Sequence, residues 1–194
     1  SVLAIWVGGV MLVAILKPHA RPEGLVDPKP HQLFFGRYFL FFVMSQIQAA
    51  VIVAGDLLVL KIQCVEPALL FATGAITSLV FSLLIYALTV SFGDVGKAVV
   101  VVVMVLQIAG SSGTFPIELL PDVYQKIYHI FPFPYAIDAM RECICGLYGL
   151  TWLKNIGCLL IFGAAALLIG LWVRKPFMGL NHFMEEKLEE TEML

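Results

Sequence analysis

The chain has 194 residues, of which 60% are hydrophobic and only 13% are charged. A soluble domain typically has about 25% charged residues, so a soluble fold of this length would expose a large apolar surface to water. The composition therefore excludes a soluble globular protein and indicates an integral membrane protein. The formal net charge of −2 also argues against nucleic-acid binding, because phosphates are recognised by a basic face.

Five apolar runs follow one another along the chain. Backbone polar groups in lipid must be hydrogen-bonded within their own segment, so each run is expected to be a transmembrane helix. Strands of a membrane barrel would alternate between apolar and polar residues, and the run VVVVVM does not. The predicted fold class is therefore an all-α polytopic membrane protein with five transmembrane helices, at about residues 1–16, 38–60, 68–92, 98–111 and 152–173.

The basic residues are unequally divided between the two sides of such a bundle. Residues 17–37, 92–97 and 174–194 share one side and carry eight of the twelve lysines and arginines. The positive-inside rule places this side and the C-terminus in the cytoplasm and Ser1 outside the cell. The acidic tail at 176–194 is then cytoplasmic, and we expect it to be solvated.

Two loops are distinctive. The one at 17–33 contains four prolines, which favour extended or turn structure over helix; we expect a solvated connector, with contact to a cytoplasmic partner as the alternative. Residues 113–150 are too long and too apolar for a plain loop and are divided by four further prolines. They predict an outer pair of short helices before the last span, either re-entrant or lying in the interface.

A few polar residues stand inside or next to the apolar runs. Asp56 lies in the second apolar run, where an ionisable residue suggests a function. The simpler interpretation is that Asp56 is hydrated near the outer membrane boundary, close to Lys61. Gln46 and Gln48 are expected to hydrogen-bond to neighbouring helices. Candidate residues for a substrate pathway or outer gate are Asp56, Glu118, Asp138, Arg141 and Glu142.

The charged residues of the outer segment also have a structural interpretation. Arg141 follows Asp138 by three residues, so the two side chains can pair on one helical face. Pairing would lower the cost of placing these charges near the lipid headgroups.

The chain lacks the patterns of enzyme chemistry. None of its four cysteines has zinc-site spacing, and there is no H-E-x-x-H motif, no G-x-S-x-G elbow and no phosphate-binding loop. We expect no enzymatic activity, no metal and no cofactor. Cys64 could form a disulfide with Cys143 or Cys145, but free thiols, including Cys158 in the last span, are the favoured interpretation.

Small residues recur at helical spacing in two spans. Gly163, Ala166 and Gly170 share a face of the last span, and Gly74 and Ser78 share a face of the third. Such faces allow helices to approach closely. We expect them to pack within one chain, with a homodimer seam as the alternative.

Two neighbouring motifs carry a family resemblance. Residues 113–121 read GTFPIELLP, and residues 131–142 read FPFPYAIDAMRE. This region closely resembles the C-terminal membrane region of the phage infection protein (YhgE/Pip) family, whose membrane part is similar to the type-2 permeases of ABC exporters. The resemblance follows the order of spans along the whole chain, and its specific residues are Phe115, Pro116, Glu118, Pro121, Pro134, Tyr135, Ala136 and Arg141.

The resemblance implies a function and a set of partners. Residues 1–175 would be a permease-like domain in a bacterial cell membrane that moves an apolar or amphipathic substrate out of the cell as a homodimer. Because the chain has no phosphate-binding loop, ATP hydrolysis would come from a separate ABC ATPase, docked on residues 17–37 and 92–97. The alternative is a non-transporting anchor or scaffold for a large extracellular domain used in phage adsorption or type VII secretion.

The resemblance also implies that this chain is part of a longer protein. Family members have a first span and a large extracellular domain before five further spans, so Ser1 is expected to follow that domain. The immediate start of an apolar run, without the basic region of a signal peptide, agrees with this expectation. An anchor is expected to pair its polar intramembrane residues internally, whereas a permease needs a polar or amphipathic seam.

Overall fold

A computed structural model describes residues 1–16, 30–110 and 130–173 of the chain. Within these ranges every regular element is a helix, which confirms the all-α prediction. The helices are α1 (Val2–Ile15), α2 (Pro30–Leu58), α3 (Pro67–Gly110), α5 (Pro132–Cys145) and α6 (Thr151–Leu168), the last of which continues as the π-helix η3 (Ile169–Val173).

Three of the described helical segments are long and apolar enough to cross a membrane: Phe34–Leu58, Pro67–Gly93 and Thr151–Trp172. Two shorter apolar helices, Val2–Ile15 and Val95–Ile108, correspond to the first and fourth predicted spans. All five apolar runs are therefore helical, and three of them have the length of a complete span. The structure thus supports a multi-pass membrane protein, while the count of five spans and the orientation remain predictions.

The start of α2 differs from the sequence prediction. The proline-rich stretch at 17–33 favoured extended structure, yet residues 30–33 are the first turn of α2. The reason is the position of Pro30. A proline at the first helical position has a suitable φ angle and needs no hydrogen bond for its missing N–H. The other prolines of this stretch, and the acidic tail, lie outside the described residues.

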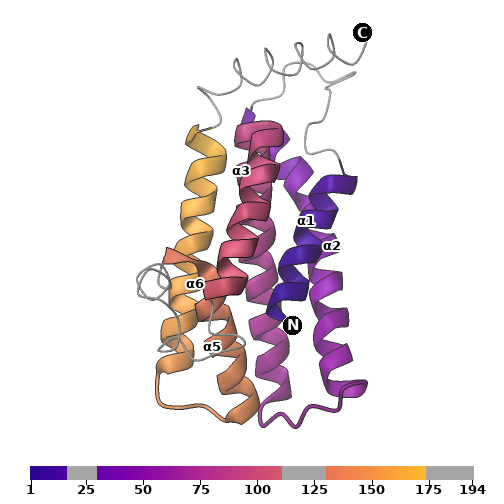
Figure 1. Cartoon of the computed structure of the whole chain (residues 1–194), viewed down its shortest axis with the longest axis vertical. Helices are drawn as coiled ribbons and strands as arrows, with labels where there is room; N and C mark the ends of the chain where they lie inside the picture. The colour runs from indigo at the N-terminus through magenta and orange to yellow at the C-terminus, as the bar shows by residue number, and fades with distance from the viewer. Residues whose placement is uncertain (17–29, 111–129, 174–194) are drawn as a thin grey trace.

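Figure 1 shows that α3 is a helical hairpin. Its first arm, Pro67–Gly93, runs the full length of the bundle, and its second arm turns back beside it and ends near mid-height. Helix α5 starts close to that point and runs to the lower end. The loops at 59–66 and 146–150 lie together at the lower end. This agrees with the sequence prediction, in which both loops are on the side opposite residues 92–97.

The first arm of α3 forms the centre of the core. Val80, Phe81, Ile85, Tyr86 and Ala87 are all buried on it, and the arm packs against α1, α2, α5 and α6. The other helices therefore keep one face on α3 and turn large apolar side chains outward, the pattern expected where the surrounding medium is lipid.

The predicted small-residue faces pack within the chain. An ideal Cβ on Gly163 would lie 3.4 Å from Val80, and one on Gly170 would lie 2.6 Å from the ring of Phe34. On the third span, Ser78 donates a hydrogen bond to the carbonyl oxygen of Ser45 at 2.8 Å. These faces are thus used for intramolecular packing, as expected, and are not free to form a homodimer seam.

Candidate functional site

Several partly buried polar side chains in the described ranges are hydrogen-bonded to a neighbouring helix. Gln46 donates through Nε2 to the carbonyl oxygen of Ala75 at 3.1 Å, and Gln48 donates to that of Ala4 at 3.3 Å. The prediction that both glutamines hydrogen-bond to adjacent helices is confirmed. Tyr38 likewise donates to the carbonyl oxygen of Leu79 at 3.2 Å. These bonds join α2 to α1 and to the first arm of α3.

Helix α5 begins inside the protein, where the unpaired N–H groups of a helix start would be costly. Its sequence removes most of that cost. Pro132 and Pro134 have no N–H to satisfy, and the N–H of Phe133 between them donates to Oε1 of Gln107 at 3.2 Å. These two prolines, which belong to the motif at 131–142, and Gln107 on the second arm of α3 therefore allow α5 to start in the interior of the protein.

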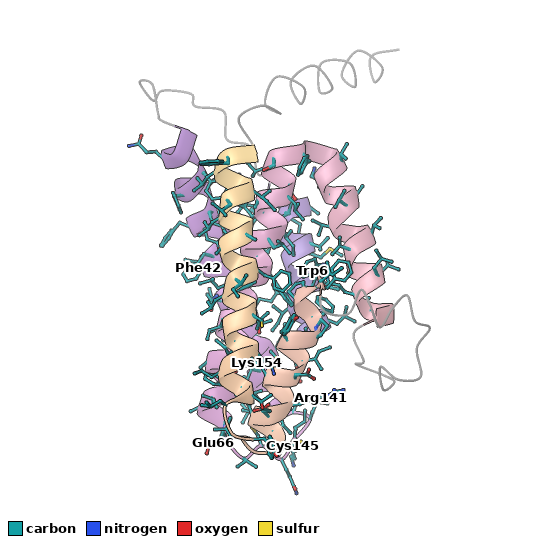
Figure 2. The ribbon with its side chains drawn as sticks, turned by 90° about the vertical axis from the view of Figure 1, so that its left-hand side faces the viewer. Trp6, Phe42, Glu66, Arg141, Cys145 and Lys154 are labelled. Atoms are coloured by element: carbon teal, nitrogen blue, oxygen red, sulfur yellow. The ribbon has the colours of Figure 1, made fainter. Side chains whose placement is uncertain are left out.

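An aromatic cluster surrounds the same point. Trp6 packs edge-on against Phe81 and Phe133, with ring centroids 4.9 and 5.3 Å apart, and Phe81 stacks on Phe133 at 5.2 Å. All three rings are buried. Figure 2 shows Trp6 at the level where α5 starts. The cluster joins α1, α3 and α5.

The other end of α5 is held by backbone and thiol contacts. The N–H groups of Val65 and Glu66 donate to the carbonyl oxygens of Ile144 and Cys143 at 3.3 and 3.1 Å. The Cys64 thiol donates to the same Cys143 carbonyl at 3.2 Å. Cys64 and Cys143 are therefore neighbours, as a disulfide would require, but all four thiols are free in this structure, which agrees with the favoured interpretation.

The thiols should differ in reactivity. Burial raises the pKa of the Cys143 thiol, so at neutral pH less of it is the reactive thiolate than in a free cysteine. Cys145 is exposed. We expect iodoacetamide to modify Cys145 first and Cys143 last, with the lag at Cys143 shrinking as the pH is raised. Peptide mass spectrometry over a pH series would measure this, and equal rates at the two positions would contradict it.

Three of the predicted site residues lie together on the last turns of α5. Nη1 of Arg141 donates to Oδ1 of Asp138 at 3.5 Å, and both side chains are substantially exposed. The predicted pair on one helical face is thus confirmed. Glu142 follows, with one carboxylate oxygen buried and without a hydrogen-bond partner. Asp56 lies on α2 instead, where it accepts a hydrogen bond from the hydroxyl of Ser1.

The family motif is divided by the described ranges. Its second part, Pro134, Tyr135, Ala136 and Arg141, lies on α5. Its first part, which contains Phe115, Pro116, Glu118 and Pro121, lies outside the described residues. Whether 113–150 is re-entrant or interfacial therefore stays a prediction, although the start of α5 is buried in protein.

Sequence reasoning missed a set of buried polar atoms with no hydrogen-bond partner. They belong to Trp6, Thr77, Gln107 and Asn155, together with the carboxylate of Glu142. Gln107 could have been found, because it stands in the apolar run VVVVVMVLQIAG, where a polar side chain is costly. The others could not, since hydroxyl, amide and indole groups occur throughout the apolar runs and only the packing shows which lack partners.

We expect Gln107→Leu to loosen the start of α5. The change leaves the Phe133 N–H without an acceptor, and a buried unpaired N–H costs about 1–3 kcal/mol. Backbone amides of α5 should exchange with deuterium several-fold faster, as measured by mass spectrometry of the 133–145 peptide. Gln46→Leu is the matched control, because the Ala75 carbonyl remains bonded within its own helix. Equal exchange in α5 of both variants would show that Gln107 does not cap it.

Comparison with known proteins places this fold in a family. A family model described as ABC-2 family transporter protein matches residues 26–172, which include α2, α3, α5 and α6. The chain is also 30% identical to the uncharacterized protein YhgE of Bacillus subtilis (strain 168), over 97% of the chain and 23% of that protein. It therefore spans less than a quarter of this relative. No solved structure matches. The resemblance inferred from the two motifs is confirmed, and the chain belongs to the ABC-2 family of membrane transporter proteins.

Proposed function

We propose that this chain is the membrane domain of an exporter. In this proposal two copies form a permease that moves an apolar or amphipathic molecule out of the cell, and a separate ABC ATPase supplies the energy. The observation that carries the proposal is the family match across 26–172, because it covers the central hairpin α3 and the short helix α5 together.

The chemistry of the interior supports an uncharged or amphipathic cargo. In the described ranges the buried polar side chains are serines, threonines, one glutamine and one asparagine. A cargo group that loses its water among these side chains would meet neutral hydrogen-bonding groups and no countercharge. The ion pair of Asp138 and Arg141 is exposed on the last turns of α5, where charges are hydrated.

A second candidate function is a non-transporting anchor. Two observations favour it: the chain covers only 23% of YhgE, and many buried hydroxyls and amides are paired internally, as an anchor requires. On this alternative the helices would hold a larger domain in the membrane, and phage adsorption or secretion would depend on that domain.

Recovery of partners separates the two functions. We would cross-link the full-length protein in its native membrane, purify it and identify the associated chains by mass spectrometry. A permease should bring down a second copy and a nucleotide-binding subunit. Lys97→Glu, at the turn of α3, should release that subunit, whereas Lys154→Glu, near the start of α6 at the opposite end of the bundle, should retain it. Repeated recovery without any nucleotide-binding subunit would count against the permease.

A further inference from the structure

In the described ranges, four buried side chains have hydrogen-bonding atoms with no partner. They are Trp6, Thr77, Gln107 and Asn155, whose exposed fractions are 0, 0, 1 and 8%. The unpaired atoms are the indole Nε1, the threonine hydroxyl and the two amide nitrogens. We call these four side chains the α5 seat, because each of them borders helix α5.

Two members of the seat touch the first turn of α5. The Trp6 ring packs on Phe133 at 5.3 Å. Gln107 accepts the hydrogen bond of the Phe133 N–H through Oε1, while its Nε2 has no acceptor. Both helices that supply these side chains, α1 and the second arm of α3, therefore present an unused donor where α5 begins.

Thr77 lies between two contacts of the same α3 face with α5. One turn earlier on α3, the Thr73 hydroxyl is 3.3 Å from the Cys143 thiol; one turn later, Phe81 stacks on Phe133. Residues four apart share a helical face, so the Thr77 side chain points toward the middle of α5.

Asn155 borders α5 from α6. It lies two turns before Phe162, and Phe162 contacts Tyr135 of α5 with ring centroids 5.9 Å apart. Residues seven apart on a helix return to the same face, so Asn155 also faces α5. The fifth unpaired atom, on Glu142, belongs to α5 itself. All five unpaired atoms found in the described part of the chain thus lie on α5 or around it.

Away from α5, comparable side chains are satisfied. The Thr89 hydroxyl donates to the carbonyl oxygen of Ile85 at 2.8 Å, Ser91 donates to that of Ile169 at 3.3 Å, and Ser45 to that of Phe42 at 2.9 Å. A buried donor without a partner destabilises the packed arrangement. The destabilisation is therefore concentrated around α5. If α5 moved away, hydrogen-bond acceptors could reach these donors, and the destabilisation would be removed.

The seat has a definite chemistry. All four unpaired groups are donors or, for the hydroxyl, can donate, and none of them carries charge. They can therefore donate hydrogen bonds to uncharged oxygen acceptors. An apolar chain attached to such an acceptor would contact the aromatic faces of Trp6 and Phe81. We propose that α5 moves out of its seat as a unit and that the uncovered donors then bind the ester or ether oxygens of an amphipathic molecule. This inference rests on the proposed export function and narrows its cargo.

Deuterium exchange of the purified full chain in maltoside micelles tests the movement of α5. Amides of the 133–145 peptide should exchange faster than those of the first arm of α3. Thr77→Val keeps the shape of the side chain and removes an unpaired donor, so it should slow exchange in α5 several-fold by favouring the seated form. Thr89→Val, which removes a paired hydroxyl from the same helix, should not slow it. If Thr77→Val fails to fold, Asn155→Leu makes the same test. Exchange of α5 as slow as that of α3 would overturn the proposal.

Fluorescence tests the ligand. The contribution of Trp6 is the difference between the emission of the native chain and that of Trp6→Phe. Dioctanoylglycerol should shift it to the red in a saturable manner, because the indole N–H gains an acceptor, and the shift should be weaker in Thr77→Val. Hexadecane should not produce it. An equal shift with hexadecane, or emission already red-shifted by water without any addition, would overturn the proposal.

The outcome is separable from that of the export function. If a nucleotide-binding subunit were recovered but Trp6 emission did not respond to the ester, the export function would be supported and the α5 seat would be excluded as the binding site. A saturable response to the ester in a protein that never recovers an ATPase would support the seat and count against export.

Discussion

We expect Gly96→Ala to disrupt the α3 hairpin. Gly96 stands just after the turn, where the two arms of α3 come together, and an ideal Cβ there would lie 2.8 Å from the carbonyl carbon of Leu88 and 3.0 Å from Cα of Thr89. These are backbone atoms, which cannot rotate away as a side chain would. Overpacking typically costs about 1–3 kcal/mol, and we expect the upper end of this range. Thermal unfolding in micelles, followed by circular dichroism, would show a lower midpoint.

Gly157→Ala is the matched control for this prediction. It makes the same change in α6, at a position where an added Cβ would have no atom within 4 Å. Alanine is favoured over glycine in a helix by up to about 1 kcal/mol, so this variant should be as stable as the native chain or slightly more so. Equal midpoints for the two variants would show that the arms of α3 can separate at Gly96 without loss.

The helices were predictable from the sequence because a long apolar run in a membrane has few alternatives to helix. The turn between the third and fourth runs was also predictable, because two glycines, an aspartate and a lysine interrupt the apolar sequence at 92–97. The close approach of the two arms at this turn was not predictable. Gly93 adopts a φ of 59°, and the arms approach so closely at Gly96 that only glycine fits. Both features depend on how the two arms pack, which the periodicity of one segment does not contain.

The candidate site was predictable only in part. Asp138 and Arg141 pair through local helical geometry, so their spacing was sufficient to predict the contact. Thr77 and Thr89 look alike in the sequence, each within an apolar run, yet one hydroxyl is paired and the other is not. That difference depends on the orientation of single side chains in the packed bundle. The family resemblance identified the segment that contains α5, but not the side chains that surround it.

Trp6→Ala should have the largest effect of any single substitution in the aromatic cluster. The side chain is completely buried and packs on rings from α3 and α5, so its removal would leave a cavity where α1, α3 and α5 meet. Truncation of a buried tryptophan typically costs about 3–5 kcal/mol. Packing of this kind is retained in a membrane, where helix association depends on van der Waals contact more than on exclusion of water. Thermal unfolding would measure the loss, and deuterium exchange should place it at α1 and α5 first.

Trp172→Ala provides the comparison that assigns this loss to packing. Trp172 is 76% exposed in η3, so its truncation removes the same side chain from a position that faces outward. Substitutions away from packed contacts usually change stability by less than about 0.5 kcal/mol. If the two alanine variants unfolded at the same midpoint, the aromatic cluster would not hold α5 in place. A large loss confined to Trp6→Ala would instead show that one side chain on α1 stabilises the junction from which α5 starts.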